Sequence, residues 1–571
     1  MMNMEKNAKK IIYNAKVYLR RQEFAQAVLI EGGRIAAVGA DSDILADAPS
    51  DAVRINAYGR LLLPGFYDSH LHLIGVGLMA HVINFSGLSS LEECVAYARI
   101  EIARKSPPPG IIRGDGLNQE NFIGEKRFPT RRDLDRITTE QPLFITRVCG
   151  HIGFCNSKML ELLGLLTSDS GTAIGAATGA MTASAVFLEG AEFDENGEPN
   201  GILRGGCLAQ AREMLPAATD EFLRGNLAYA MKCALENGVT AVGSCDIIQA
   251  HTFQRIVAAY HSIYCGQKPN LRITLQNGVA DDPKRLDDYI QNGHVTGAVL
   301  EESYLKIGAL KLFADGSLGA RTARMRGSYH DDPLTQGVPE MDWALLRELI
   351  EKAHKNGLQV IVHAIGDAAI EEVIKDFEAL GDPVNSLRHG IVHCQITDKA
   401  LLSRMAKSNL LALVQPIFLS NDLYIAESRV GAALASTSYA WGSMERLGIR
   451  AAYGTDAPVE PLNPLLGIAC AVTRKDLSKN YPENGFCPEE CVDVYTAVDN
   501  YTTAGAYAHF DENRLGRIQA GYEADMVLLD KDIFTIPPDE IPSAHVLWTM
   551  ISGETAFERQ PVSEGVPKPA D

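Results

Sequence analysis

The chain has 571 residues, 46% of them hydrophobic and 22% charged, which is enough for one large domain with an appended module. Its 53 Lys and Arg against 72 Asp and Glu give a formal net charge of −19. This charge disfavours nucleic acid and anionic membranes as partners, so we expect a small-molecule substrate, with no nucleic-acid and no membrane partner.

The N-terminal sequence and the cysteines indicate the cellular compartment in which the protein is expected. The opening stretch MMNMEKNAKKIIYNAKVYL lacks the apolar core of a secretory signal. No run approaches the roughly 18 apolar residues of a membrane helix. The 11 cysteines are scattered without CxxC pairs, as is typical of buried thiols in a reducing compartment. We therefore expect a cytoplasmic protein.

Both ends of the chain predict short strands. Apolar and polar residues alternate in IIYNAKVYL, QAVLIEGGRIAAVG and RINAYGRLLLPG, with turn residues between them. The stretches GRIQAGYEADMVLLD and HVLWTMISGETAFE near the C-terminus have the same character. We predict one small β-sandwich formed jointly by residues 1–63 and 515–571.

The middle of the chain predicts an α/β fold, with apolar runs that alternate with helical stretches such as WALLRELIEKAHKNG. The eight candidate strands are LLLPGFYDSHLHL, GVTAVGSCD, LRITLQN, YLKIGALKLFADGS, LQVIVHAIGD, RHGIVHCQ, LLALVQPIF and IRAAYGTDA. Eight such units predict a (β/α)8 TIM-like barrel over residues 64–514, with its active site at the C-terminal strand ends.

The first β/α unit of this barrel is interrupted. Its strand ends near residue 73 and the next begins near residue 239, which is far more chain than one crossover helix needs. We therefore predict an insertion after the first barrel strand, over about residues 80–225, and expect it to cover the barrel mouth.

The stretch LPGFYDSHLH places two histidines, His70 and His72, one residue apart at the end of an apolar run. Residues i and i+2 of a strand point to the same side, so both imidazoles can face the barrel axis. Two imidazoles there suit a divalent metal such as zinc. Taken alone, the pair is equally well explained by a structural hydrogen bond or by solvent exposure.

Polar residues also follow four other predicted strands. They are Lys311, with Asp315 just beyond it, His363, His393 and Asp456. Burying such groups is costly unless they are paired or ligated, so their convergence with His70 and His72 favours a metal site. A buried Lys311 has a lowered pKa and could react with carbon dioxide to give an anionic carbamate that bridges two ions. Asp456 could bind one ion and act as general base and then acid.

The motifs PGFYDSHLH, KLFADGSLGARTA, VHAIGDAAI, IVHCQ, YGTDAPVEPLNP and GRIQAGYEADMVLLD resemble the metal-dependent amidohydrolase superfamily. They are similar to its YtcJ-like branch, which includes N-substituted formamide deformylases. The resemblance implies that His70 and His72 bind a first metal, with Asp456 serving that metal and catalysis. It implies that His363 and His393 bind a second metal, that a carbamate on Lys311 bridges the two ions, and that the protein forms a homodimer. Two zinc ions per chain are the preferred state, and one ion is the alternative.

Three further residues are candidate substrate contacts: His151 in the insertion, Arg321 in SLGARTA, and Trp441. Each has a structural alternative, namely holding a loop, pairing with a protein carboxylate, and core packing. For His389 we expect a structural hydrogen bond, because it precedes His393 by four residues and lies at the other end of that strand.

The leading functional prediction is hydrolysis of a C–N bond in an amide, such as an N-substituted formamide, by a metal-activated hydroxide with Asp456 as general base and acid. The alternative is a non-catalytic ligand-binding or regulatory protein, although all six metal-site positions are filled. Deamination is less favoured, because His363-Ala-Ile-Gly-Asp367 lacks the glutamate that deaminases of this superfamily carry after the corresponding histidine.

Overall fold

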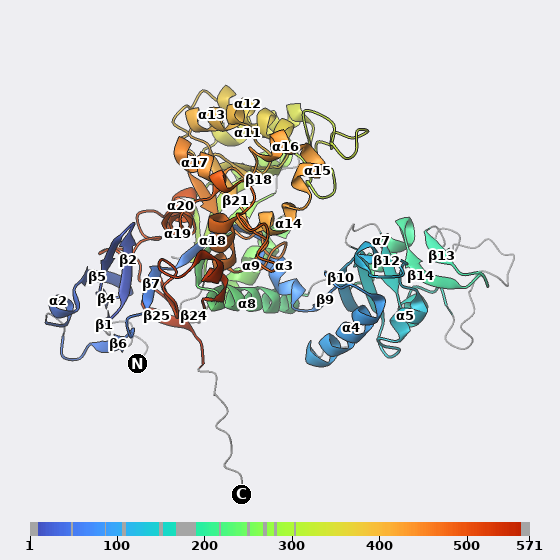
Figure 1. Cartoon of the computed structure of the whole chain (residues 1–571), viewed down its shortest axis with the longest axis horizontal. Coiled ribbons are helices and arrows are strands. Elements are labelled where there is room, and N and C mark those ends of the chain that lie inside the picture. The colour runs from blue at the N-terminus through green and yellow to red at the C-terminus, as the bar shows by residue number, and fades with distance from the viewer. Residues whose placement is uncertain are drawn as a thin grey trace, which may run out of the picture. The chain divides into compact units, whose positions relative to one another are not determined.

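A computed structural model of the chain describes residues 9–46, 49–85, 87–105, 110–147, 152–166, 190–215, 219–247, 252–265, 271–278, 282–301 and 304–560 (Figure 1). The chain divides into two compact units. The first consists of Met1–Gly75 and Leu227–Asp571, and the second of Val76–Asn226. Within the described part of the chain, no helix combines the length and the apolar character needed to cross a membrane.

Eight parallel strands form a barrel in the first unit, and they are the eight predicted from the sequence. In spatial order they are β8 (Phe66–Leu71), β15 (Val239–Ile247), β16 (Arg272–Asn277), β18 (Leu305–Phe313), β19 (Val360–Ala364), β20 (Gly390–His393), β21 (Leu411–Val414) and β22 (Ala451–Tyr453). The last strand returns to the first, because Ser69 Oγ donates to Ala452 O at 3.1 Å and Asp456 N donates to His70 O at 2.8 Å. The short β17 (Val299–Glu301) pairs antiparallel with β18.

Helices follow the barrel strands. The main ones are α8 (Asp220–Glu236), α9 (Phe253–Tyr264), α10 (Pro283–Gln291), α11 (Trp343–Lys355), α12 (Asp367–Ala379), α13 (Lys399–Lys407), α17 (Trp441–Leu447), α18 (Pro464–Thr473), α19 (Val494–Asn500) and α20 (Thr503–Ala508), with the short α14 (Leu419–Asp422), α15 (Ala426–Val430) and α16 (Ala432–Ala435). In α11 the side chains of Leu346, Leu349, Ile350 and Ala353 are buried, which is the spacing of one helix face.

Two sheets built from both ends of the chain pack into a β-sandwich. One contains β5 (Arg34–Gly39), β4 (Ala27–Glu31), β1 (Lys10–Tyr13) and β6 (Val53–Asn56); the other contains β25 (Glu554–Glu558), β24 (Val546–Ile551), β23 (Met526–Leu529), β7 (Leu61–Pro64), β2 (Lys16–Arg20) and β3 (Glu23–Ala25). A short helix, α2 (Asp41–Ala46), follows β5. Ile12 and Val28 of the first sheet share a core with Leu62 and Leu528 of the second. The predicted fold class, a TIM-like barrel with a composite β-sandwich, is confirmed.

The second unit contains a six-stranded sheet of its own. Its order is β13 (Ala191–Phe193), β14 (Pro199–Leu203), β12 (Gly153–Cys155), β11 (Leu143–Arg147), β10 (Ile112–Leu117) and β9 (Val82–Asn84). The described helices of this unit include α4 (Leu91–Lys105), α5 (Arg131–Asp135), α6 (Ser157–Leu162) and α7 (Gly205–Glu213), while α3 (Leu73–Met79) follows the first barrel strand. That this unit covers the barrel mouth stays a prediction, as do the domain limits drawn from the sequence.

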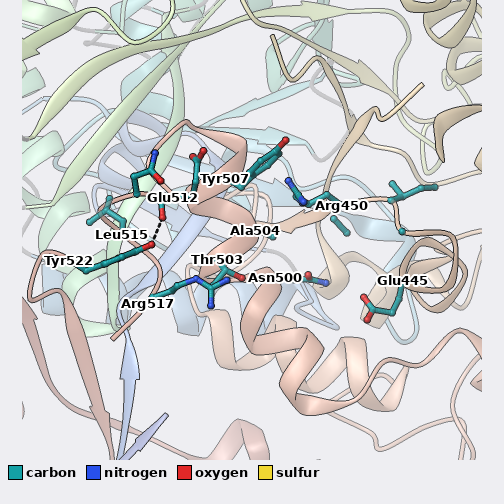
Figure 2. A pocket seen from close by; sticks show the side chains of 14 residues that line it. Glu445, Arg450, Asn500, Thr503, Ala504, Tyr507, Glu512, Leu515, Arg517 and Tyr522 are labelled. Atoms are coloured by element: carbon teal, nitrogen blue, oxygen red, sulfur yellow. Dashed lines mark hydrogen bonds between the residues drawn. The ribbon is translucent and has the colours of Figure 1, made fainter. Parts of the chain in front are cut away.

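A cavity of about 640 Å³ lies beside α20 at the N-terminal end of β22 (Figure 2). Arg450 and Ala451 line it where the strand begins, and Arg517 and Glu512 line it from the segment after α20. The catalytic end of such a barrel is the opposite one, where the strands finish. This cavity is therefore separate from the site predicted from the sequence.

Candidate metal centre

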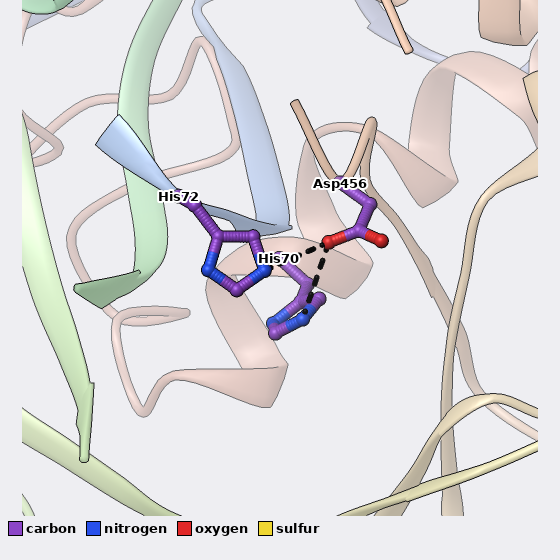
Figure 3. Close-up of side chains that lie close together, drawn as sticks. All are labelled: His70, His72 and Asp456. Atoms are coloured by element: carbon purple, nitrogen blue, oxygen red, sulfur yellow. Dashed lines mark ion pairs between the residues drawn. The ribbon is translucent and has the colours of Figure 1, made fainter. Parts of the chain in front are cut away.

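Three of the predicted ligands meet where the first and last barrel strands end. His70 lies in β8, His72 directly follows it, and Asp456 lies three residues beyond β22. Asp456 Oδ1 is 3.1 Å from His72 Nε2 and 3.5 Å from His70 Nε2. Figure 3 shows both imidazole rings beside this carboxylate. The three side chains each offer a ligand atom, and these atoms all lie within 4.8 Å of one another.

The carboxylate of Asp456 shows that this arrangement suits a cation. Its Oδ1 atom is buried and, among the residues that the structure describes, pairs with the two imidazoles but has no well-aligned hydrogen bond. A buried carboxylate oxygen without a well-aligned hydrogen bond is costly, and a divalent metal ion held jointly with the two imidazoles would satisfy it. Asp456 also has a φ of +54°, in the left-handed region that is uncommon for non-glycine residues but is tolerated by Asp. The residues present therefore fit a divalent metal.

The protonation of His72 responds to the same carboxylate. Burial opposes its charge, but the neighbouring Asp456 outweighs burial and raises the pKa of His72 to about 11. The imidazole therefore holds a proton in the metal-free protein, and a bound cation would replace that proton.

The remaining predicted ligands lie around the same end of the barrel interior. The ring centroids of His363 and His393 are 4.5 Å apart, and those of His70 and His393 are 5.8 Å apart. Ala309 and Ile361 belong to one buried hydrophobic cluster of the barrel strands. Lys311 and His363 come two residues after them on the same strands, so their side chains point to the same face of the sheet as these core residues. His393 has a φ of +72°, which departs from strand geometry where β20 ends.

Burial disfavours the charged form of these groups. It is the main cause that holds the pKa of His70 and of His393 well below the usual range, and that lowers the pKa of His363 to about 3. Lys311 is only 1% exposed, and burial lowers its pKa as well, opposed by the nearby Cys245 and Asp456. Neutral imidazole is the ligand form of histidine, and a neutral amine is the reactive form of lysine.

Each of the four histidines has one ring nitrogen beside a hydrogen-bond acceptor. The pairs are His70 Nδ1 with Gln276 Oε1, His72 Nδ1 with Cys245 O at 2.7 Å, His363 Nε2 with Gly316 O at 3.0 Å, and His393 Nδ1 with Gln415 Oε1 at 2.7 Å. An oxygen acceptor requires N–H on that nitrogen, so when the ring is neutral the other nitrogen carries the lone pair. Histidines that bind metals have this arrangement.

Two buried carboxylates beside the ligands have backbone partners. Asp68 accepts hydrogen bonds from Thr455 Oγ1 at 2.6 Å and from the backbone N–H groups of Thr455 and His70, so it joins the ends of β8 and β22. Asp315 accepts from the N–H groups of Ile365 and Gly366 at 3.0 and 2.8 Å. Burial raises the pKa of each to about 7. Both therefore shape the loops that carry the ligands.

The sequence reasoning missed Gln276, Gln415, Asp68 and Cys245. A signal for the two glutamines existed, because Gln276 lies near the C-terminal end of β16 and Gln415 directly follows β21, and other strands carry a predicted ligand at this end. The carbonyl of Cys245 had no such signal, because every residue has a backbone carbonyl and the residue type does not show which one accepts a hydrogen bond.

The candidate substrate contacts lie as follows. Arg321 pairs with Asp331, with Nη2 and Oδ2 2.9 Å apart. Trp441 is buried at the start of α17, and its ring is 4.7 Å from the guanidinium carbon of Arg474. His151 lies outside the described residues. His389 makes the expected structural hydrogen bond, in which its Nδ1 accepts Val360 N–H at 2.9 Å.

Comparisons of the sequence and of the structure with known proteins find relatives of similar kind. Residues 54–557 match the family described as "Amidohydrolase family". YtcJ of Bacillus subtilis (strain 168), a protein named as an amidohydrolase, is 31% identical over 95% of this chain and 97% of its own length. The N-substituted formamide deformylase of Arthrobacter pascens is 27% identical over 96% of this chain and 97% of its own length. An uncharacterized metal-dependent hydrolase from Pyrococcus furiosus superposes with a TM-score of 0.71 at 27% identity, over 92% of this chain and 100% of that one.

Proposed function

Because the chain belongs to the amidohydrolase family, we propose that it is a metal-dependent hydrolase that cleaves the C–N bond of an amide, such as an N-substituted formamide. The observation that carries this proposal is the carboxylate of Asp456, whose buried Oδ1 atom lies between the imidazoles of His70 and His72 without a well-aligned hydrogen bond among the described residues. Similarity to a formamide deformylase over nearly the whole chain supports the substrate class.

The proposal includes two zinc ions. His70, His72 and Asp456 would hold the first, and His363 and His393 the second, with a carbamate on Lys311 between them. The burial of Lys311 and its lowered pKa support the carbamate, because the free amine is the form that reacts with carbon dioxide. A single ion held by His70, His72 and Asp456 is the alternative. We also propose that the protein is a homodimer and lies in the cytoplasm.

The chemistry divides between the ion and the chain. When bound, the metal would polarise the amide carbonyl and activate a water molecule. Asp456 would accept a proton from the attacking water and return it to the leaving nitrogen, so that the C–N bond breaks to give a carboxylic acid and an amine. The four histidines would hold the ions through neutral rings, and the burial of the strand ends would strengthen these electrostatic interactions.

The test is hydrolysis of a panel of N-substituted formamides and larger amides by metal-free protein and by the same protein after addition of zinc. The proposal predicts release of formate or another acid, together with an amine, only from the zinc-loaded protein. Equal turnover in the two preparations would contradict metal dependence. Zinc-loaded protein that binds these amides without cleaving any would instead favour the ligand-binding alternative.

A further inference from the structure

The buried side-chain amides of Gln276 and Gln415 each contact one of the predicted histidine ligands. Gln276 lies in β16 and is 0% exposed, and Gln415 directly follows β21 and is 3% exposed. The Oε1 atom of Gln276 faces Nδ1 of His70, and that of Gln415 faces Nδ1 of His393. Neither glutamine is itself among the predicted ligands.

The orientation of each amide is fixed from its other end. Gln276 Nε2 donates to the backbone carbonyl of Ser69 at 2.8 Å, and Gln415 Nε2 donates to that of Leu413 at 3.2 Å. A rotation of either amide by half a turn would place its oxygen against that carbonyl oxygen. The anchors therefore determine which atom of each glutamine faces the imidazole.

An amide oxygen can only accept a hydrogen bond, so the facing Nδ1 must carry the proton. A neutral imidazole has one N–H, and its lone pair is then on Nε2. In His70, Nε2 is the nitrogen that points to Asp456. The amides thus select the tautomer that suits metal binding, before any metal arrives.

The side chain of Gln276 is tightly packed where it contacts Ser69. A Cβ atom added to Gly243 would lie 2.4 Å from Gln276 Nε2 and 2.5 Å from Ser69 O. Only glycine at position 243 leaves room for the amide and its anchor. His509 Nε2 also lies 3.2 Å from Ser69 O, and its ring stacks on Tyr67 with centroids 4.9 Å apart.

We propose that Gln276 and Gln415 are positioning residues, which fix the Nδ1–H tautomer of His70 and His393 and so present the Nε2 lone pair of each ring to a metal ion. The inference about metal rests on the proposed function, whereas the tautomer is a property of the metal-free protein. Gln276 would act on the first ion through His70, and Gln415 on the second through His393.

The first measurement is histidine tautomer assignment by ¹⁵N NMR of metal-free protein labelled at histidine. In the wild type, His70 and His393 are expected to be Nδ1–H imidazoles, and Gln276→Met and Gln415→Met are each expected to change the signals of one of these two rings. Two variants whose histidine signals match the wild type, or Nε2–H tautomers at His70 and His393 in the wild type, would overturn the inference.

The second measurement is zinc affinity by competition with a chelator. Loss of such a hydrogen bond to a ligand typically weakens metal binding about 10–100-fold, which is the effect expected for each variant. Gln415→Glu keeps an oxygen acceptor for His393 and is expected to retain most of the affinity that Gln415→Met loses.

Gln359→Met is the matched control. Gln359 is a buried amide at the start of β19, whose Nε2 donates to Arg388 O at 2.8 Å and Ala508 O at 3.0 Å. Its loss should lower stability without changing zinc affinity. Equal weakening of zinc binding by Gln359→Met would show a general structural effect and overturn the inference. If wild type binds no zinc but the tautomers change as expected, the proposed function fails and the tautomer assignment stands.

Discussion

Asp456 Oδ1 lies 3.1 Å from His72 Nε2, although the two residues follow the last and the first strands of the barrel. Closure of the barrel therefore assembles the site. The hydrogen bond from Asp456 N to His70 O and the link from Asp68 to Thr455 hold the two strand ends together. The site forms only when the first and last β/α units have both folded.

Replacing Asp456 by Asn should separate catalysis from metal binding. The amide cannot accept the proton of the attacking water, and loss of a general base typically lowers the rate about 10²–10⁴-fold. His70 and His72 remain, and we expect bound metal to be largely retained. The measurement is kcat beside metal content for Asp456→Asn and wild type. Full activity in the variant would remove Asp456 from the mechanism.

Lys311→Met should affect the metal-free and metal-loaded proteins in opposite ways. Lys311 is buried, and the structure gives it no carboxylate ion pair among the described residues. Replacing a buried ionisable side chain by an apolar one of similar volume removes its desolvation cost and is often neutral or stabilising. We therefore expect the free energy of unfolding of the metal-free variant to be at least that of wild type, while metal content per chain falls. Unchanged metal content would argue against a bridging lysine.

The close approach at Gly243 gives a steric prediction. A Cβ there would overlap Gln276 Nε2 and Ser69 O, at 2.4 and 2.5 Å, so Gly243→Ala should displace Gln276 and weaken zinc binding. Gly225→Ala is the control, because a Cβ at Gly225 in α8 would meet no atom within 4 Å. Alanine in a helix is favoured over glycine by roughly 0.5–1 kcal/mol, so this control should be slightly stabilised. Similar zinc affinity in both variants would contradict the prediction.

Because His389 is buried, we expect the free energy of unfolding to fall in acid. Burial lowers its pKa to about 3, whereas an unfolded histidine has a pKa of about 6.5. Below that value the unfolded state gains a proton that the folded state does not, so stability falls as pH drops from about 6.5 toward 3. The free energy of unfolding of metal-free protein should fall more steeply over this window in wild type than in His389→Gln, by up to about 1.4 kcal/mol per pH unit. Equal slopes would show that His389 does not contribute.

Much of the barrel could be predicted from the sequence, because buried parallel strands leave continuous apolar runs. The runs before His363, His393 and Asp456 each proved to be a barrel strand. The convergence of the charged and imidazole side chains at their ends followed from the rule that active sites lie at the C-terminal strand ends.

The supporting contacts could not be predicted in the same way. The hydrogen bond from His72 to the Cys245 carbonyl uses a backbone atom, and the one from His70 to Gln276 depends on which strands are neighbours. Neutral glutamines at strand ends are also less conspicuous than charged residues, since their burial is cheaper. Arg321 could have faced substrate or a protein carboxylate, and only the folded loop shows it beside Asp331.

The central claim is that the strand ends hold a catalytic metal centre. The most direct measurement is elemental analysis of metal per chain, on protein purified without chelator, beside an intact mass recorded under gentle conditions. The account predicts about two zinc ions per chain and added mass that matches a carbamate on Lys311. Protein that contains no metal and takes up none on reconstitution would contradict it, and would leave His70 and His72 as ordinary buried histidines.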